Sequence, residues 1–335
     1  MTQYSKQALL YFPSTVLFID DDPLFLSTVG FNLNKHTHFK LCEKPQAALA
    51  ILQDAPSIHE EIRHIITDLE LPDTEVSDGY SLKADVQSLY RTIYNSDRFS
   101  YISTVVIDYS MPYFNGADLC GQLRQSPVKK IMLTGEADHQ IAVELFNKGL
   151  INHFIIKNSP NMQAELQFAI QKAQLAYFEE ASASLFDYLM QLPESFRHID
   201  FSKHATHLFK DHSFSEYYVL DGAGSTLFID ADGKATWIIV KSPDDIESYT
   251  DIAADQDAPR NIIQLLEDKA ALPFFFAASD HQIPAKNWMP YLHTAKQLGD
   301  HYYAQIKESD IYDINLGNFL SHSQYLRKHF SGISI

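Results

Sequence analysis

Three acids, a hydroxyl and an amine stand in this sequence directly after apolar, strand-like runs. They are Asp20, Asp21, Asp108, Thr134 and Lys157. Clustered carboxylates suit Mg²⁺, which prefers hard oxygen ligands, and one carboxylate can attack phosphorus to form an acyl phosphate. A hydroxyl and an amine can donate to the transferred oxygens. If the fold gathers these side chains, they predict a site for a divalent metal and for phosphoryl transfer.

The segments around these residues alternate between strand-like and helix-like patterns. Strands are expected at 15–22, 39–44, 63–70, 103–108, 129–135 and 152–157, and helices are expected after Pro23 and at 45–53, 80–95, 116–125 and 138–149. This alternation predicts a doubly wound α/β fold with a parallel sheet. In such sheets ligands bind beyond the carboxyl ends of the strands. The five side chains are therefore expected on one rim.

Four motifs in chain order resemble the receiver domain of two-component response regulators. They are "VLFIDDDP", "VVIDYSMPYFNG", "IMLTGEA" and "FIIK", and they lie within residues 14–160. The resemblance implies a flavodoxin-like fold, a Mg²⁺ cofactor and a sensor histidine kinase or phosphotransfer protein as partner.

The same resemblance implies a role for each matching residue. Asp20, Asp21 and Asp108 are expected to bind the metal, and Asp108 is expected to accept the phosphoryl group. Thr134 is expected to be the signalling hydroxyl and Lys157 the bridging cation. Phe154 is expected to be the aromatic ring that reports phosphorylation.

A second segment, "HIITDLELPD" around Asp68, competes with the segment around Asp108. Asp68 lies 48 residues after Asp20, which is near the family's usual separation, whereas Asp108 lies 26 residues before Thr134. Only Asp108 is followed by Met-Pro and then by Asn115-Gly116, which opens a helix. The Asp68 segment is crowded with acids instead. We therefore expect Asp108 to be the acceptor and residues of about 58–100 to be an inserted strand–helix unit.

The sequence departs from the receiver pattern at Asn158, where the family usually has proline after the lysine. This departure and the insertion favour an alternative, an unphosphorylated pseudo-receiver scaffold. A second alternative is a haloacid-dehalogenase-like phosphatase with Asp20 and Asp22 as its two acids. Leu24 and the lack of a late acidic motif argue against the phosphatase.

Beyond residue 160 the pattern changes. Residues 161–192 contain no proline or glycine and predict one long connecting helix, with Leu185 and Leu189 on a stripe available for self-association or for contact between domains. Residues 216–242 read as three antiparallel strands. The division expected is a receiver at 1–160, the helix at 161–192 and an α+β output domain at 193–335. The whole layout resembles the Legionella-type quorum-sensing response regulators. The length of the helix favours either a connection between domains or a homodimer.

Composition limits the possible functions. The chain has 335 residues, 45% of them hydrophobic, and a formal net charge of −17. This acidity does not support DNA binding. The two cysteines read as free thiols, and neither a leader nor a membrane-spanning run is recognisable. We expect a cytoplasmic signalling protein rather than an enzyme, with no chemistry beyond its own phosphorylation and dephosphorylation.

Overall fold

The structure is a computed structural model that describes residues 8–33, 37–69, 88–112, 114–135, 139–189, 214–221, 223–275, 282–307 and 319–330. The chain divides into two compact units. The first combines Met1–Asp68, Ser96–Leu185 and Tyr325–Ile335, and the second combines Leu69–Asn95 and Phe186–Gln324.

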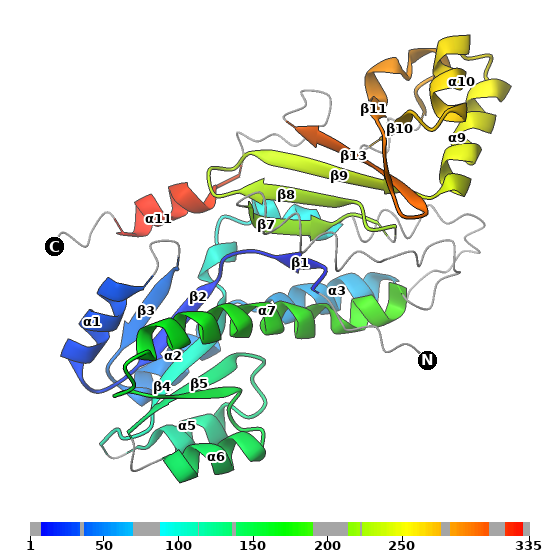
Figure 1. The fold of residues 1–335 in the computed structure, drawn as a ribbon. Coiled ribbons are helices and arrows are strands. Elements are labelled where there is room, and N and C mark those ends of the chain that lie inside the picture. Colours follow the sequence, from blue (N-terminus) through cyan, green and yellow to red (C-terminus); the bar gives the residue numbers. More distant parts are fainter. Residues whose placement is uncertain are drawn as a thin grey trace. The chain divides into compact units, whose positions relative to one another are not determined.

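The first unit is built on a parallel sheet (Figure 1). Its strands follow the order β3-β2-β4-β5-β6. Every neighbouring pair is parallel. Their bounds are β2 (Thr15–Ile19), β3 (Phe39–Cys42), β4 (Ile102–Asp108), β5 (Lys129–Thr134) and β6 (His153–Ile156). The expected doubly wound parallel sheet is confirmed, and β4 occupies its centre.

Helices cover both faces of this sheet (Figure 1). One face packs against α1 (Pro23–Asn32) and α7 (Met162–Leu189), and the other packs against α2 (Pro45–Asp54), α5 (Gly116–Gln122) and α6 (His139–Asn147). Alternate residues of β2 supply the two cores, because neighbouring side chains of a strand point to opposite faces. Burial on both faces explains why these strands read as continuous apolar runs.

The long helix α7 continues past the sheet, and its residues up to Leu185 belong to the first unit. Phe178 packs edge-on against Phe12, with ring centroids 4.7 Å apart, and the Ser182 hydroxyl accepts the backbone N–H of Leu9 at 3.1 Å. Leu185, expected on an exposed stripe, is fully buried, while the side chain of Leu189 lies outside the described residues. The helix between Phe178 and Leu185 therefore packs into the first unit's own core.

The strand expected at 63–70 is wrong. Residues Ile58–Leu69 form helix α3 instead, with Ile58 and Ile62 buried. Of the helix expected at 80–95, residues 80–87 lie outside the described part, and Ser88–Tyr94 form a 3-10 helix, η1. A second 3-10 turn, η2 (Arg98–Ser100), leads into β4.

Two short elements complete the first unit. Strand β1 (Leu10–Tyr11) lies near the N-terminus, and helix α11 (His322–Phe330) lies near the C-terminus. The end of α11 packs here through Tyr325, whose ring centroid is 5.0 Å from His38 and 5.1 Å from Phe99.

The second unit is α+β. Strands β7, β8, β9, β13 and β12 are hydrogen-bonded in that order as antiparallel neighbours. The three strands expected at 216–242 are confirmed as β7 (Phe214–Val219), β8 (Thr226–Asp230) and β9 (Ala235–Lys241). Two further strands of this sheet, β12 (Lys296–Leu298) and β13 (His301–Lys307), were not expected.

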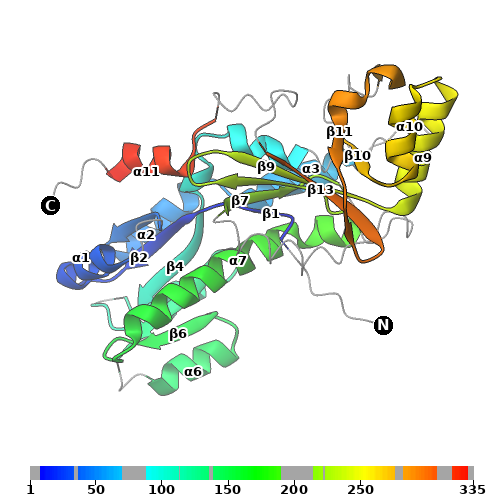
Figure 2. The same ribbon diagram turned by 45° about the horizontal axis from the view of Figure 1, so that its top comes forward.

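Two helices, α9 (Pro243–Asp255) and α10 (Arg260–Glu267), lie side by side in this unit (Figure 2). A two-stranded sheet of β10 (Ala271–Pro273) and β11 (Leu292–Thr294) accompanies them, with 3-10 turns η6 (Ala285–Asn287) and η7 (Met289–Tyr291). Phe275 and Trp288 fill the core beneath the helices, with ring centroids 5.1 Å apart.

No helix in the described part of the chain is both long and apolar enough to cross a membrane.

Candidate functional site

The chemically capable side chains meet at the carboxyl rim of the parallel sheet. Asp20 directly follows β2, Asp108 ends β4, Thr134 ends β5 and Lys157 directly follows β6. These four strands are neighbours in the sheet. Residues far apart in the sequence therefore reach one edge, as the strand-end argument requires.

Three carboxylates form the acidic part of this rim. Asp20, Asp21 and Asp108 each offer one carboxylate oxygen, and these oxygens all lie within 4.8 Å of one another. Asp20 and Asp108 are buried, with 1% and 4% of their surface exposed, whereas Asp21 is exposed. Hard oxygen donors with one solvent-facing member suit Mg²⁺, which keeps several of its waters. The residues present therefore fit the divalent metal that the resemblance implies.

Lys157 bridges the two buried acids. Its Nζ lies 2.7 Å from Asp20 Oδ2 and 2.9 Å from Asp108 Oδ1. Burial alone would lower the pKa of Lys157, but the hydrogen bonds and charges of Asp20 and Asp108 outweigh it and raise the pKa. The ammonium therefore stays charged at neutral pH and offsets the crowding of the carboxylates.

Opposing effects act on the pKa of the Asp20 carboxyl group. Burial raises its pKa, and the hydrogen bonds from Lys157 and from the backbone N–H of Asp22 only partly offset that rise. The Asp22 N–H donates to Asp20 Oδ1 at 3.0 Å. With Oδ2 held by Lys157, both oxygens of Asp20 have a partner.

Asp22 serves as the N-cap of helix α1. Its Oδ1 accepts the backbone N–H groups of Leu24 at 2.9 Å and Phe25 at 3.2 Å, and Pro23 takes the first helical position. Aspartate caps helices well because it satisfies otherwise unpaired N–H groups. This contact disfavours the phosphatase alternative, which needs Asp22 as a catalytic acid.

The turn after Asp108 depends on Gly116. The Gly116 N–H donates to the carbonyl of Tyr109 at 3.0 Å, and a Cβ added to Gly116 would lie 2.3 Å from the carbonyl oxygen of Asp108. Asn115 caps the helix that follows, since its side chain accepts the N–H of Asp118 at 2.9 Å. Sequence spacing therefore identified a turn in which only glycine fits.

Thr134 ends β5 at the rim, whereas Phe154 lies earlier along β6 and pairs with Met132. The Thr134 hydroxyl is fully buried and donates to the Gly135 carbonyl at 3.1 Å. Phe154 is half-buried on β6, with its ring centroid 6.5 Å from that of Phe146. Thr134 therefore lies at the rim and Phe154 two residues before the rim end of β6, and their signalling roles stay predictions.

The departure at Asn158 leaves the backbone regular. No cis peptide bond occurs among the described residues, so the bond between Lys157 and Asn158 is trans. The Lys157 N–H donates to the Thr134 carbonyl at 2.9 Å and continues the β5–β6 pairing by one step.

Sequence reasoning missed one neighbour of the rim, Phe25. The Lys157 Nζ lies 4.4 Å from the centroid of the Phe25 ring. Because the two residues are separated by more than one hundred positions, no spacing rule could have paired them.

Comparison with known proteins finds a solved structure that is similar over nearly the whole chain. No protein-family model matches the chain, and no curated protein sequence matches it significantly. Among solved structures, the response regulator LqsR of Legionella pneumophila is 27% identical, with a TM-score of 0.74 and 96% of each chain covered.

Smaller receiver-domain structures match only part of the chain. A CheY-like receiver protein from Methanospirillum hungatei is 17% identical, covering 50% of this chain and 98% of that one, with a TM-score of 0.32. TrrA from Thermotoga maritima, solved with Mg²⁺ and BeF, is 15% identical, covering 48% and 98%, with a TM-score of 0.30. Likenesses this weak support no argument.

The sheet topology and the similarity that spans both units define the class. The first unit is a flavodoxin-like receiver domain, and an α+β domain accompanies it. Over nearly its whole length the chain resembles one response regulator in particular, LqsR.

Proposed function

We propose that this protein is a response regulator of a two-component phosphorelay and that Asp108 accepts the phosphoryl group. The single observation that carries the proposal is the gathering of Asp20, Asp21 and Asp108 around Lys157 at the rim of the sheet. Its similarity to LqsR supports a response regulator role.

In the proposed step, a carboxylate oxygen of Asp108 forms a bond to phosphorus. The bond between phosphorus and the donor breaks, and its electron pair leaves with the donor group. That donor is a phosphohistidine nitrogen of a sensor kinase or phosphotransfer protein. Lys157 lies against Asp108 Oδ1, so its ammonium faces the negative charge on the transferred oxygens. Mg²⁺ held by Asp20, Asp21 and Asp108 would supply further positive charge there.

The consequence of phosphorylation is proposed to be a change in dimer or domain contacts. The Thr134 hydroxyl would turn from Gly135 toward the phosphoryl group, and Phe154 would follow. Two apolar side chains on α7, Phe168 and Leu175, are 57% and 40% exposed and offer a surface for self-association. The layout proposed is a receiver, the long helix and an output domain, in a quorum-sensing pathway of the cytoplasm.

The test is phosphorylation of the purified full-length chain with acetyl phosphate and Mg²⁺. We expect one acyl phosphate per chain, stable in acid and labile in alkali, that is absent from Asp108→Asn because an amide is not a nucleophile. Light scattering on the same samples reports any change of oligomeric state. A wild-type chain that takes no label would instead favour the pseudo-receiver scaffold.

A further inference from the structure

We propose that Phe25 is a positioning residue for Lys157, a role that rests on the proposed phosphoryl transfer. The contact is direct, because the Lys157 Nζ lies 4.4 Å from the ring centroid. An ammonium over an aromatic face is attracted by the negative charge of that face, most strongly where water is excluded. The side chain of Lys157 is only 23% exposed, which favours a strong contact.

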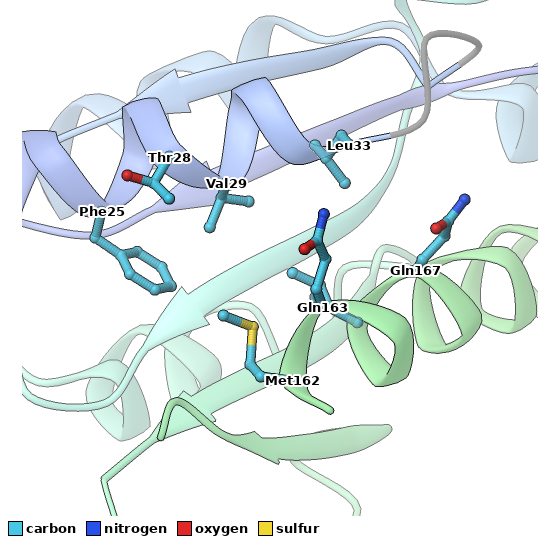
Figure 3. Close-up of a pocket in the computed structure, with 8 residues that line it drawn as sticks. Phe25, Thr28, Val29, Leu33, Met162, Gln163 and Gln167 are labelled. Carbon is cyan, nitrogen blue, oxygen red and sulfur yellow. The ribbon is translucent and has the colours of Figure 1, made fainter. Parts of the chain in front are cut away.

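Phe25 is itself held firmly in place. It occupies the first turn of α1, where its backbone N–H is bound by the Asp22 cap at 3.2 Å. Its ring points into the space between α1 and α7, beside Met162 (Figure 3). The ring packs against the apolar core on this face of the sheet. The helix that follows the acidic cluster thus presents a fixed aromatic face to the lysine.

The ring supplies a contact that phosphoryl transfer does not consume. In this structure Lys157 is held by Asp20 and Asp108. Once Asp108 carries a phosphoryl group, its carboxylate is an acyl phosphate, and Asp20 is an expected metal ligand. Both carboxylate partners therefore change during the reaction. The contact with Phe25 involves neither of them, so the ring keeps the ammonium beside the phosphoryl oxygens while its other partners change.

The first experiment compares three variants by their initial rate of acyl phosphate formation with acetyl phosphate and Mg²⁺. Phe25→Leu keeps an apolar side chain but removes the aromatic face, and Phe25→Tyr keeps the face. Leu33→Ala is the matched control, because Leu33 lines the same space from the opposite end of α1 and packs on the same core.

We expect Phe25→Leu to lower the saturating rate about fivefold, the value of a partly buried cation–π contact. The apparent KM for acetyl phosphate should change little, because the ring acts on the charge that the transition state develops. Phe25→Tyr should stay within about twofold of wild type. Leu33→Ala should also keep its rate, although its thermal unfolding temperature falls.

A double-mutant cycle with Lys157→Ala separates positioning from packing. If Phe25 acts through Lys157, Phe25→Leu should slow the Lys157→Ala protein no further. Equal slowing in both backgrounds, or a wild-type rate in Phe25→Leu, would overturn the inference while leaving the proposed function intact. An unlabelled wild-type chain would refute the proposed function and this inference with it.

Discussion

Asp68 and Asp108 each follow an apolar run and each precede a proline four residues later, yet they occupy different structures. Asp108 ends the central strand β4, with 4% of its surface exposed. Asp68 lies in the last turn of helix α3. Asp108 can therefore meet the residues at the other strand ends on the rim. Asp68 belongs to a helix and not to a strand end.

The difference between these two segments shows that the residues before an apolar run help to decide whether it forms a helix or a strand. Ile58, Ile62, Ile65 and Leu69 recur at intervals of four, three and four, which is the pattern of one helix face. Before Asp108, every residue of β4 is buried, as in a strand covered on both faces. After Asp108, Gly116 allows the chain to return close to the strand end.

The largest effect expected from this comparison concerns phosphoryl labelling. Asp68→Asn should label with acetyl phosphate at the wild-type level, whereas Asp108→Asn should fall to background. The reason is that the lysine and the other acids lie around Asp108. Mass spectrometry of the alkali-labile phosphate measures both. Label lost from Asp68→Asn and kept by Asp108→Asn would reverse the assignment.

The helical character of the Asp68 segment can be tested by stability. Ile62→Ala removes a side chain that is 1% exposed and should lower the free energy of unfolding by about 2–5 kcal/mol. The control Glu60→Ala changes an exposed position of the same helix and should shift it by about 0.5 kcal/mol or less. Urea denaturation gives both values. Similar losses at the two positions would argue against a helix with one buried face.

The turn after Asp108 offers a matched pair of glycines. Gly116→Ala places a Cβ 2.3 Å from the carbonyl oxygen of Asp108 and should destabilise the protein by about 1–3 kcal/mol through overpacking. Gly121→Ala in the same helix meets no atom within 4 Å and should stabilise it by about 0.5–1 kcal/mol. Thermal unfolding distinguishes these opposite signs, and matching signs would contradict the steric account of the turn.

The smallest effect concerns Asp22, the acid that the phosphatase alternative requires. As an N-cap, it should contribute about 1 kcal/mol to stability, which Asp22→Ala removes. The Asp22→Ala protein should still be labelled by acetyl phosphate, because Asp22 lies outside the cluster of Asp20, Asp21 and Asp108. Loss of labelling in a folded Asp22→Ala protein would restore a catalytic role for this residue.

The positions of the rim residues were predictable because each follows an apolar run that is visible in the sequence. Asp20 and Asp108 follow or end buried strands, and parallel pairing brings such ends together. The start of the helix at Pro23 was also visible, since proline is tolerated in the first turn of a helix. These features depend on local sequence and on one topological rule.

Other features depend on contacts that local sequence does not encode. Phe25 meets Lys157 only after the whole sheet has formed. The strands β10 and β12 have three residues each, too few for an alternating pattern to stand out. Leu185 reads as an exposed stripe residue until the N-terminal segment is known to pack against the same helix.

The three separate stretches that make up the first unit also bear on inheritance. A recombination that exchanged only residues 1–160 would separate Phe12 from Phe178, against which its ring packs. It would also separate Leu9 from Ser182, to which Leu9 is hydrogen-bonded. The exchange would also separate His38 from Tyr325, whose ring packs on it. A receiver that is one contiguous segment can be exchanged between regulators as a unit. The first unit is therefore expected to be inherited together with the stretches of the second unit that lie between its parts in the chain.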